Sequence, residues 1–202
     1  DTDAFSGRRD RFIFASRIHR VLPLRRFSQN CFRINGADFR TSETNNELLD
    51  FRSNGGSIHM IGNGGSAATP SHSAGDWSKE LSIRTIAHTD NISSFTAWAN
   101  DTDYANVFAG QLATFARPGD LVIAYSGSGN SLNVLNGIEA ARAAGCRTAA
   151  VTGDFEGGAG GRLVSLVDVA IVVPTQSMER IEDMQLVINH IVKEAVEANH
   201  GM

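Results

Sequence analysis

Short apolar runs alternate with helical segments from about residue 55 to the end of the chain, and this alternation strongly constrains the fold. The runs are continuous stretches rich in Val, Ile and Ala. Such strands are typical of a parallel sheet covered by helices on both faces. Strands are predicted at 57–61, 84–88, 121–125, 147–152 and 167–173, and helices at 66–81, 104–116, 133–144 and 178–198. The sequence therefore predicts an α/β fold with one doubly wound parallel sheet, flavodoxin-like layering and a long C-terminal helix.

The size and composition fit one globular domain. The chain has 202 residues, of which 42% are hydrophobic and 20% charged. No apolar run approaches the ~20 residues that a membrane span needs, so no membrane partner is expected. Cys31 and Cys146 are too few for a disulfide framework. A cytoplasmic location is the expectation.

The first 40 residues differ from the rest in charge. They hold nine Arg and four Asp, a local charge of +5, although the whole chain carries −4. Apolar residues separate these arginines at roughly helical spacing, which indicates an amphipathic helix that packs on the body or on another subunit. We therefore divide the chain into an N-terminal helical arm at 1–50 and a ligand-binding domain at 51–202. No nucleic-acid partner is expected.

Two glycine- and serine-rich turns follow predicted strands and precede predicted helices. They are GNGGSAA at 62–68 and SGSGNS at 126–131. Glycine lets backbone N–H groups approach an anion, and a helix N-terminus favours negative charge. Each turn alone also fits a simple capped turn, but the pair at strand ends indicates a phosphate site. The sequence has neither a Walker loop nor a dinucleotide fingerprint, so no nucleotide cofactor is expected.

These segments, with AND at 99–101 and RIE at 180–182, resemble the sugar isomerase (SIS) domain family, and within it the phosphoheptose isomerases. The resemblance covers about residues 55–196. It implies a SIS-type sheet, a phosphorylated sugar as ligand and a homotetramer. The implied substrate-binding residues are Asn63, Gly64, Ser66, Asn100, Asp101, Ser126, Ser128, Asn130, Ser131 and Glu182.

Two pairs of polar residues are candidates for acid–base chemistry. His72 and Asp76 lie four residues apart on one predicted helix, and Glu182 and His190 lie eight apart on another, so each pair shares a face. Taken alone, the first pair equally fits a surface ion pair, and His190 a buried structural histidine. The resemblance implies that Asp76, where the family has Glu, is the base and that His190 is the second acid–base group.

The same four residues form a set suited to zinc. His72, Asp76, Glu182 and His190 would supply two imidazoles and two carboxylates, which Zn²⁺ binds. The resemblance implies that some family members bind zinc at these positions and that others work without it.

The resemblance implies an aldose–ketose isomerase of lipopolysaccharide heptose biosynthesis. The expected reaction converts sedoheptulose 7-phosphate to D-glycero-D-manno-heptose 7-phosphate through an enediol. A pentose or hexose phosphate would use the same phosphate turns and stays an alternative. A second alternative is a non-catalytic SIS protein that senses a sugar phosphate or binds the replication initiator, which the shorter Asp76 and the Arg-rich arm favour.

Overall fold

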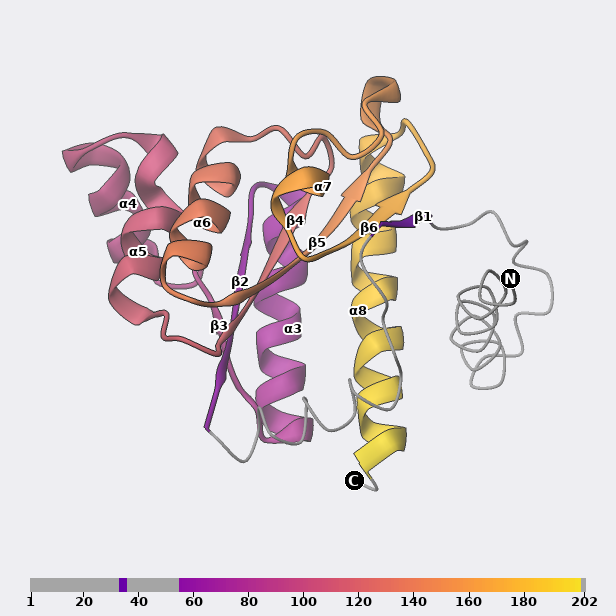
Figure 1. The fold of residues 1–202 in the computed structure, drawn as a ribbon, viewed down its shortest axis with the longest axis horizontal. Helices are drawn as coiled ribbons and strands as arrows, with labels where there is room; N and C mark the ends of the chain where they lie inside the picture. The colour runs from indigo at the N-terminus through magenta and orange to yellow at the C-terminus, as the bar shows by residue number, and fades with distance from the viewer. Residues whose placement is uncertain (1–32, 36–54, 201–202) are drawn as a thin grey trace, which may run out of the picture.

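The computed structural model describes residues 33–35 and 55–200, and these form one sheet with helices on both faces (Figure 1). The strands are β1 (Arg33–Asn35), β2 (Ser57–Gly62), β3 (Arg84–Ala87), β4 (Leu121–Ser126), β5 (Arg147–Gly153) and β6 (Val169–Val173). Their order across the sheet is β1-β6-β5-β4-β2-β3. Strands β2 to β6 pair in parallel, and β1 pairs antiparallel with β6.

The order of the five parallel strands is the flavodoxin-like one. The chain passes from β2 to its neighbour β3, and then returns across β2 to place β4 on its other side. The direction of winding therefore reverses between β2 and β4. In open α/β sheets, ligands bind at this point, outside the carboxyl ends of the strands.

The helices divide between the two faces (Figure 1). One face carries α3 (Gly65–Leu81) and α8 (Met178–His200). The other carries α4 (Ile92–Asp101), α5 (Val107–Phe115), α6 (Leu132–Ala143) and the short α7 (Leu163–Leu166). Two 3-10 turns, Tyr104–Asn106 and Phe155–Gly157, complete the elements of the described residues. Within the described residues, no helix combines the length and apolarity needed to cross a membrane.

Strand β2 supplies side chains to both halves of the core. Met60 packs in the cluster with Trp77 of α3 and Ile181 of α8, whereas Ile61 packs in the cluster with Phe108 of α5. All six residues of β2 are buried, as expected for an internal parallel strand. Burial of an Ile, Met or Phe side chain stabilises the fold by roughly 1.5–3 kcal/mol, so this strand is central to stability.

The structure confirms the predicted sheet, and it corrects the sequence interpretation at two places. Residues 33–35 form a strand on the open edge of β6, so the prediction of a helical arm is wrong there. The remainder of the predicted 1–50 arm, and the boundary at 50, lie outside the described residues. Helix α4 (Ile92–Asp101) was not expected, because its Ser- and Thr-rich sequence has low helix propensity. The Asn91 side chain starts it by accepting a hydrogen bond from the Ser94 N–H at 3.0 Å.

A buried polar chain joins three strands near the amino end of the sheet. Asp120 accepts hydrogen bonds from the Ser57 N–H at 2.7 Å and the Arg117 N–H at 2.8 Å. Asp120 Oδ2, the oxygen that accepts from Arg117, also lies 3.2 Å from His59 Nε2, and His59 Nδ1 lies 2.9 Å from His88 Nε2. These contacts fix the starts of β2 and β4 against the end of β3.

Burial lowers the pKa of His88 to about 4, and the neighbouring His59 adds to this effect. Burial also lowers the pKa of His59, although Asp120 opposes the shift. Both imidazoles are therefore neutral in the folded protein at pH 7. Unfolded histidine titrates near 6.5, so at lower pH the unfolded chain binds protons that the folded chain excludes.

We predict that the protein loses stability as the pH falls from 6.5 to 4, and that His88 accounts for a large part of this loss. Its pKa shift corresponds to about 3 kcal/mol by linkage. Thermal unfolding monitored by circular dichroism at pH 7.5, 6, 5 and 4 measures the effect. In His88→Gln, which cannot titrate, the melting temperature should fall less steeply; equal slopes would contradict the assignment.

Candidate active site

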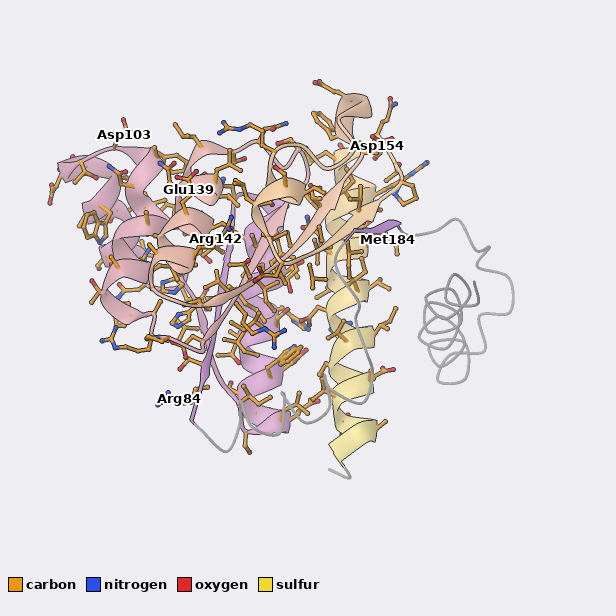
Figure 2. The ribbon with its side chains drawn as sticks, in the orientation of Figure 1. Arg84, Asp103, Glu139, Arg142, Asp154 and Met184 are labelled. Carbon is orange, nitrogen blue, oxygen red and sulfur yellow. The ribbon has the colours of Figure 1, made fainter. Side chains whose placement is uncertain are left out.

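The two glycine-rich turns lie side by side at the carboxyl end of the sheet. Strand β2 ends at Gly62 and α3 begins at Gly65, while β4 ends at Ser126 and α6 begins at Leu132. Gly62 pairs with Tyr125 across the two neighbouring strands. In Figure 2, the labelled residues Asp103 and Asp154 lie at this end of the molecule, and Arg84 lies at the opposite end. The winding reversal therefore brings both turns and both helix N-termini to one place.

Backbone conformation requires glycine in both turns. Gly64, at the start of α3, has φ 58°, and Gly129 has φ 64°. Both values lie in the left-handed region that side chains disfavour. Gly129 also lies against the carbonyl of Gly160, where a Cβ would not fit.

The N-termini of α3 and α6 leave backbone donors for a ligand. Neither helix has a side-chain hydrogen bond at its cap or an acidic residue in its first turn. Ser66 and Ser126 are buried beside these N-termini, and Ser126 Oγ accepts a hydrogen bond from the Gly129 N–H at 3.2 Å. Free N–H groups and the positive end of the helix dipole favour an anion such as a phosphate group.

Asn63 links the 62–68 turn to the first turn of α6. Its side-chain amide forms a reciprocal pair with Asn133, with both hydrogen bonds at 2.8 Å. The Tyr104 hydroxyl also donates to Asn63 Oδ1, at 3.0 Å. Sequence reasoning missed Asn133 and Tyr104. The available signal for Asn133 was a polar residue in the first turn of the helix that directly follows the 126–131 turn.

Three other predicted substrate-binding residues bind protein groups in the structure. Asn130 donates to the Ser128 carbonyl at 3.1 Å and accepts from the Arg162 N–H at 3.0 Å, so it ties the 126–131 turn to the following loop. Asn100 donates to Asp101 at 2.8 Å, and both are exposed at the end of α4. Because α4 lies on the opposite face from α3 and α8, these two residues are separated from the predicted acid–base groups within one chain (Figure 1).

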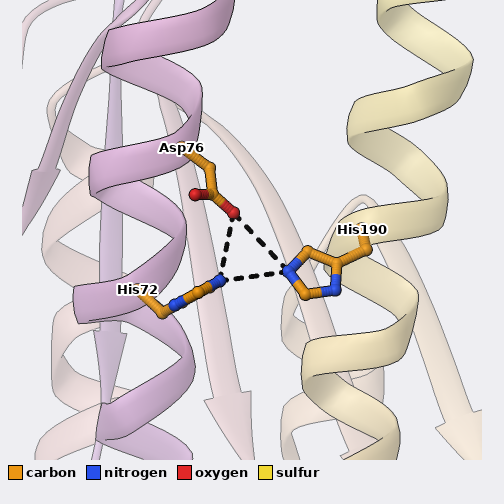
Figure 3. Close-up of side chains that lie close together, drawn as sticks. All are labelled: His72, Asp76 and His190. Carbon is orange, nitrogen blue, oxygen red and sulfur yellow. Dashed lines mark hydrogen bonds and ion pairs between the residues drawn. The ribbon is translucent and has the colours of Figure 1, made fainter.

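His72, Asp76 and His190 meet between α3 and α8 (Figure 3). The Nε2 atoms of the two histidines are 3.1 Å apart, and Asp76 Oδ2 lies 3.2 Å from His72 Nε2 and 3.5 Å from His190 Nε2. The side chains of His72, Asp76 and His190 are 51%, 24% and 42% exposed, respectively. The group is thus held by two helices and is open to solvent.

The spacing of these three atoms suits a metal ion. The three candidate ligand atoms all lie within 4.8 Å of one another. Ligands at the usual Zn–N and Zn–O distances in a tetrahedral site are roughly 3.3 Å apart, close to the three separations observed. The donor set of two imidazoles and one carboxylate is typical of zinc sites with an open coordination position.

Glu182, the fourth predicted ligand, lies apart from this group in the chain. Its carboxylate packs directly on Gly65 in the first turn of α3. Eight residues of α8 separate it from His190, a rise of about 12 Å along the helix. The structure therefore brings together three of the four residues, and places Glu182 beside the 62–68 turn instead.

Comparisons with known proteins agree with these features. Residues 44–153 match the family model of the SIS domain. The probable phosphoheptose isomerase of Thermoplasma volcanium is 35% identical over 157 residues, covering 75% of this chain and 78% of that protein. The phosphoheptose isomerase of Chlorobaculum parvum is 39% identical over 160 residues, covering 73% of each chain.

The fold of a solved relative is also similar over nearly the whole chain. The structure of the phosphoheptose isomerase from Neisseria gonorrhoeae superposes with a TM-score of 0.72 and 27% identity, covering 95% of this chain and 98% of that one. The structure of a phosphoheptose isomerase from Francisella tularensis, at 22% identity, shares the fold with a TM-score of 0.71, over 96% and 98% of the two chains. The chain therefore belongs to the phosphoheptose isomerase family of SIS-domain proteins.

Proposed function

We propose that the protein is an aldose–ketose isomerase of heptose biosynthesis that converts sedoheptulose 7-phosphate to D-glycero-D-manno-heptose 7-phosphate. The observation that carries this proposal is the position of two sites on one helix, α3. Its N-terminus lies at the phosphate turns, and its flank holds His72 and Asp76 against His190. From Ser66 to His72 the helix rises about 9 Å. A sugar of several carbons with its phosphate at the turns therefore extends toward His72, Asp76 and His190, which we call the acid–base group.

The phosphate binds at the paired turns in this proposal. Backbone N–H groups of α3 and α6 and the hydroxyls of Ser66, Ser126, Ser128 and Ser131 supply the donors. The Asn63–Asn133 pair keeps the two turns at a constant separation. Gly64 allows close approach of the backbone, and Glu182 lies where it can accept hydrogen bonds from sugar hydroxyls beside Gly65.

Asp76 and His190 transfer the protons. Asp76 removes a proton from C1 of the ketose and returns it to C2, while His190 donates a proton to the C2 carbonyl oxygen and removes one from the C1 hydroxyl. The enediol is the intermediate between these two transfers. Although Asp is shorter than the Glu of the family, Asp76 Oδ2 lies 3.5 Å from His190 Nε2, which supports its role as the base.

We also propose that His72, Asp76 and His190 hold a zinc ion. A zinc ion bound there would polarise the substrate oxygen as a Lewis acid. It would do so in place of proton donation by His190 Nε2, which would then be a ligand of the ion. His72, which transfers no proton in the proposed reaction, would then help hold the ion and orient Asp76. Glu182 completes the predicted ligand set if a second copy of the chain supplies it.

The proposed assembly is a homotetramer with substrate sites between chains. Large apolar side chains are exposed on the described surface, as expected of residues that a partner covers. They are Ile86, Ile92, Tyr104, Phe115, Leu132 and Val187. We place the enzyme in the cytoplasm, where phosphorylated sugars are made and consumed.

Turnover of sedoheptulose 7-phosphate tests the reaction. We expect the protein to convert this ketose, and Asp76→Asn to lower kcat by 10²–10⁴-fold, the usual contribution of a general base. Asp183→Asn, the same change at an exposed carboxylate of α8, serves as the control and should retain activity. If the unsubstituted protein binds the sugar phosphate without converting it, the isomerase proposal fails and a sugar-phosphate sensor replaces it.

Zinc titration of the metal-free protein by calorimetry tests the proposed ligands. His72→Gln and His190→Gln should each weaken zinc binding more than tenfold, because each removes a ligand. We expect Glu182→Gln to change the affinity less than threefold in a monomeric preparation. A loss in Glu182→Gln as large as that in His190→Gln would instead show that the carboxylate reaches the ion.

A further inference from the structure

One buried hydrogen bond crosses the interface between α3 and α8. The indole Nε1–H of Trp77 donates to Asn189 Oδ1 at 2.9 Å. Both residues are only 3% exposed, and the Trp77 ring packs in the core cluster with Ile188. Trp77 directly follows Asp76, and Asn189 directly precedes His190. The bond therefore joins the two helices at the same level as the acid–base group, on its buried side.

We propose that Trp77 and Asn189 are positioning residues whose hydrogen bond sets the register of α8 along α3, and thereby the separation between His190 and Asp76. The proposal rests on the proposed function for the chemistry of the positioned groups. The positioning itself concerns only the geometry of two helices.

The exposed group is poorly suited to set this register itself. His72 and His190 are roughly half exposed, so water competes for their polar atoms. Packed helices slide along one another by small shear movements. A displacement of about 1 Å at a catalytic group can lower a rate ~100-fold. A buried bond that is satisfied at one register and broken at others prevents such a displacement.

Other contacts of α8 do not replace this bond. Gln185, one turn earlier, donates to the Val151 carbonyl at 3.2 Å and so anchors α8 to β5. Lys193 pairs with Glu80 of α3 one turn later, where the Glu80 side chain is 38% exposed. Among the described residues, Trp77–Asn189 is the one buried side-chain hydrogen bond between α3 and α8.

The chain offers clean substitutions for the test. Asn189 Nδ2 has no hydrogen-bond partner among the described residues, so Asn189→Leu keeps the branched side-chain skeleton and removes only the bond to Trp77. Trp77→Phe removes the donor and keeps an aromatic ring. Glu80→Gln, which weakens the exposed ion pair between the same helices, is the matched control.

The first readout needs neither metal nor substrate. Histidine ring signals are recorded by NMR on metal-free wild-type protein, Asp76→Asn, Asn189→Leu, Trp77→Phe and Glu80→Gln. We expect Asn189→Leu and Trp77→Phe to move the His190 ring signals in the direction in which Asp76→Asn moves them, because each separates the ring from the carboxylate. Glu80→Gln should leave these signals in place.

The second readout is Co²⁺ affinity by calorimetry, with kcat and KM for sedoheptulose 7-phosphate. Asn189→Leu and Trp77→Phe should each weaken Co²⁺ binding and lower kcat at least tenfold. KM should change less than threefold, because the phosphate turns are untouched. The double variant should lose no more Co²⁺ affinity and no more kcat than either single variant, since both substitutions break the same bond.

The outcomes separate this proposal from the proposed function. Unchanged His190 signals, Co²⁺ affinity and kcat in a folded Asn189→Leu or Trp77→Phe variant would overturn the positioning role; if one variant does not fold, the other decides. The wild-type protein could instead neither bind Co²⁺ nor isomerise the sugar, while Asn189→Leu still moves the His190 ring signals. That result would overturn the proposed function and retain the positioning role.

Discussion

The parallel pairing of β2 with β4 is the interaction on which the site depends. It runs in register from Ile58 opposite Leu121 to Gly62 opposite Tyr125, so both strands end at the same level. The chain then leaves β2 for α3 on one face and β4 for α6 on the other. Two helix N-termini are thus presented side by side, which concentrates backbone donors and positive partial charge at one edge of the sheet.

Helix α3 connects the proposed anion site to the proposed acid–base group. Its first turn contributes Ser66 to the 62–68 turn, and its middle turns place His72 and Asp76 toward α8. Successive residues of a helix point about 100° apart, so Asp76 stays partly exposed while Trp77 enters the core. The same short segment therefore contributes to stability and, in the proposed function, to chemistry, and packing on its buried side positions the residues on its open side.

Local sequence was enough to predict the parallel strands and the shared face of His72 and Asp76, but it did not predict the helix at 92–101 or the strand at 33–35. The apolar runs located all five parallel strands, and the i, i+4 spacing placed His72 and Asp76 on one face. The helix at 92–101 was missed because its start depends on the Asn91 cap rather than on apolar periodicity. The strand at 33–35 was missed because its partner, the edge of β6, is distant in sequence.

By itself, the sequence determined the layers of the fold and the two turns, because strand burial, helix periodicity and glycine conformations are local properties. Only the tertiary structure decided which side chains meet. Glu182 and His190 share one face of α8, yet Glu182 contacts Gly65 and His190 contacts Asp76. These contacts depend on how far α8 is shifted along α3. Core packing and the Trp77–Asn189 bond set this shift, and that bond joins residues more than 100 positions apart in the chain.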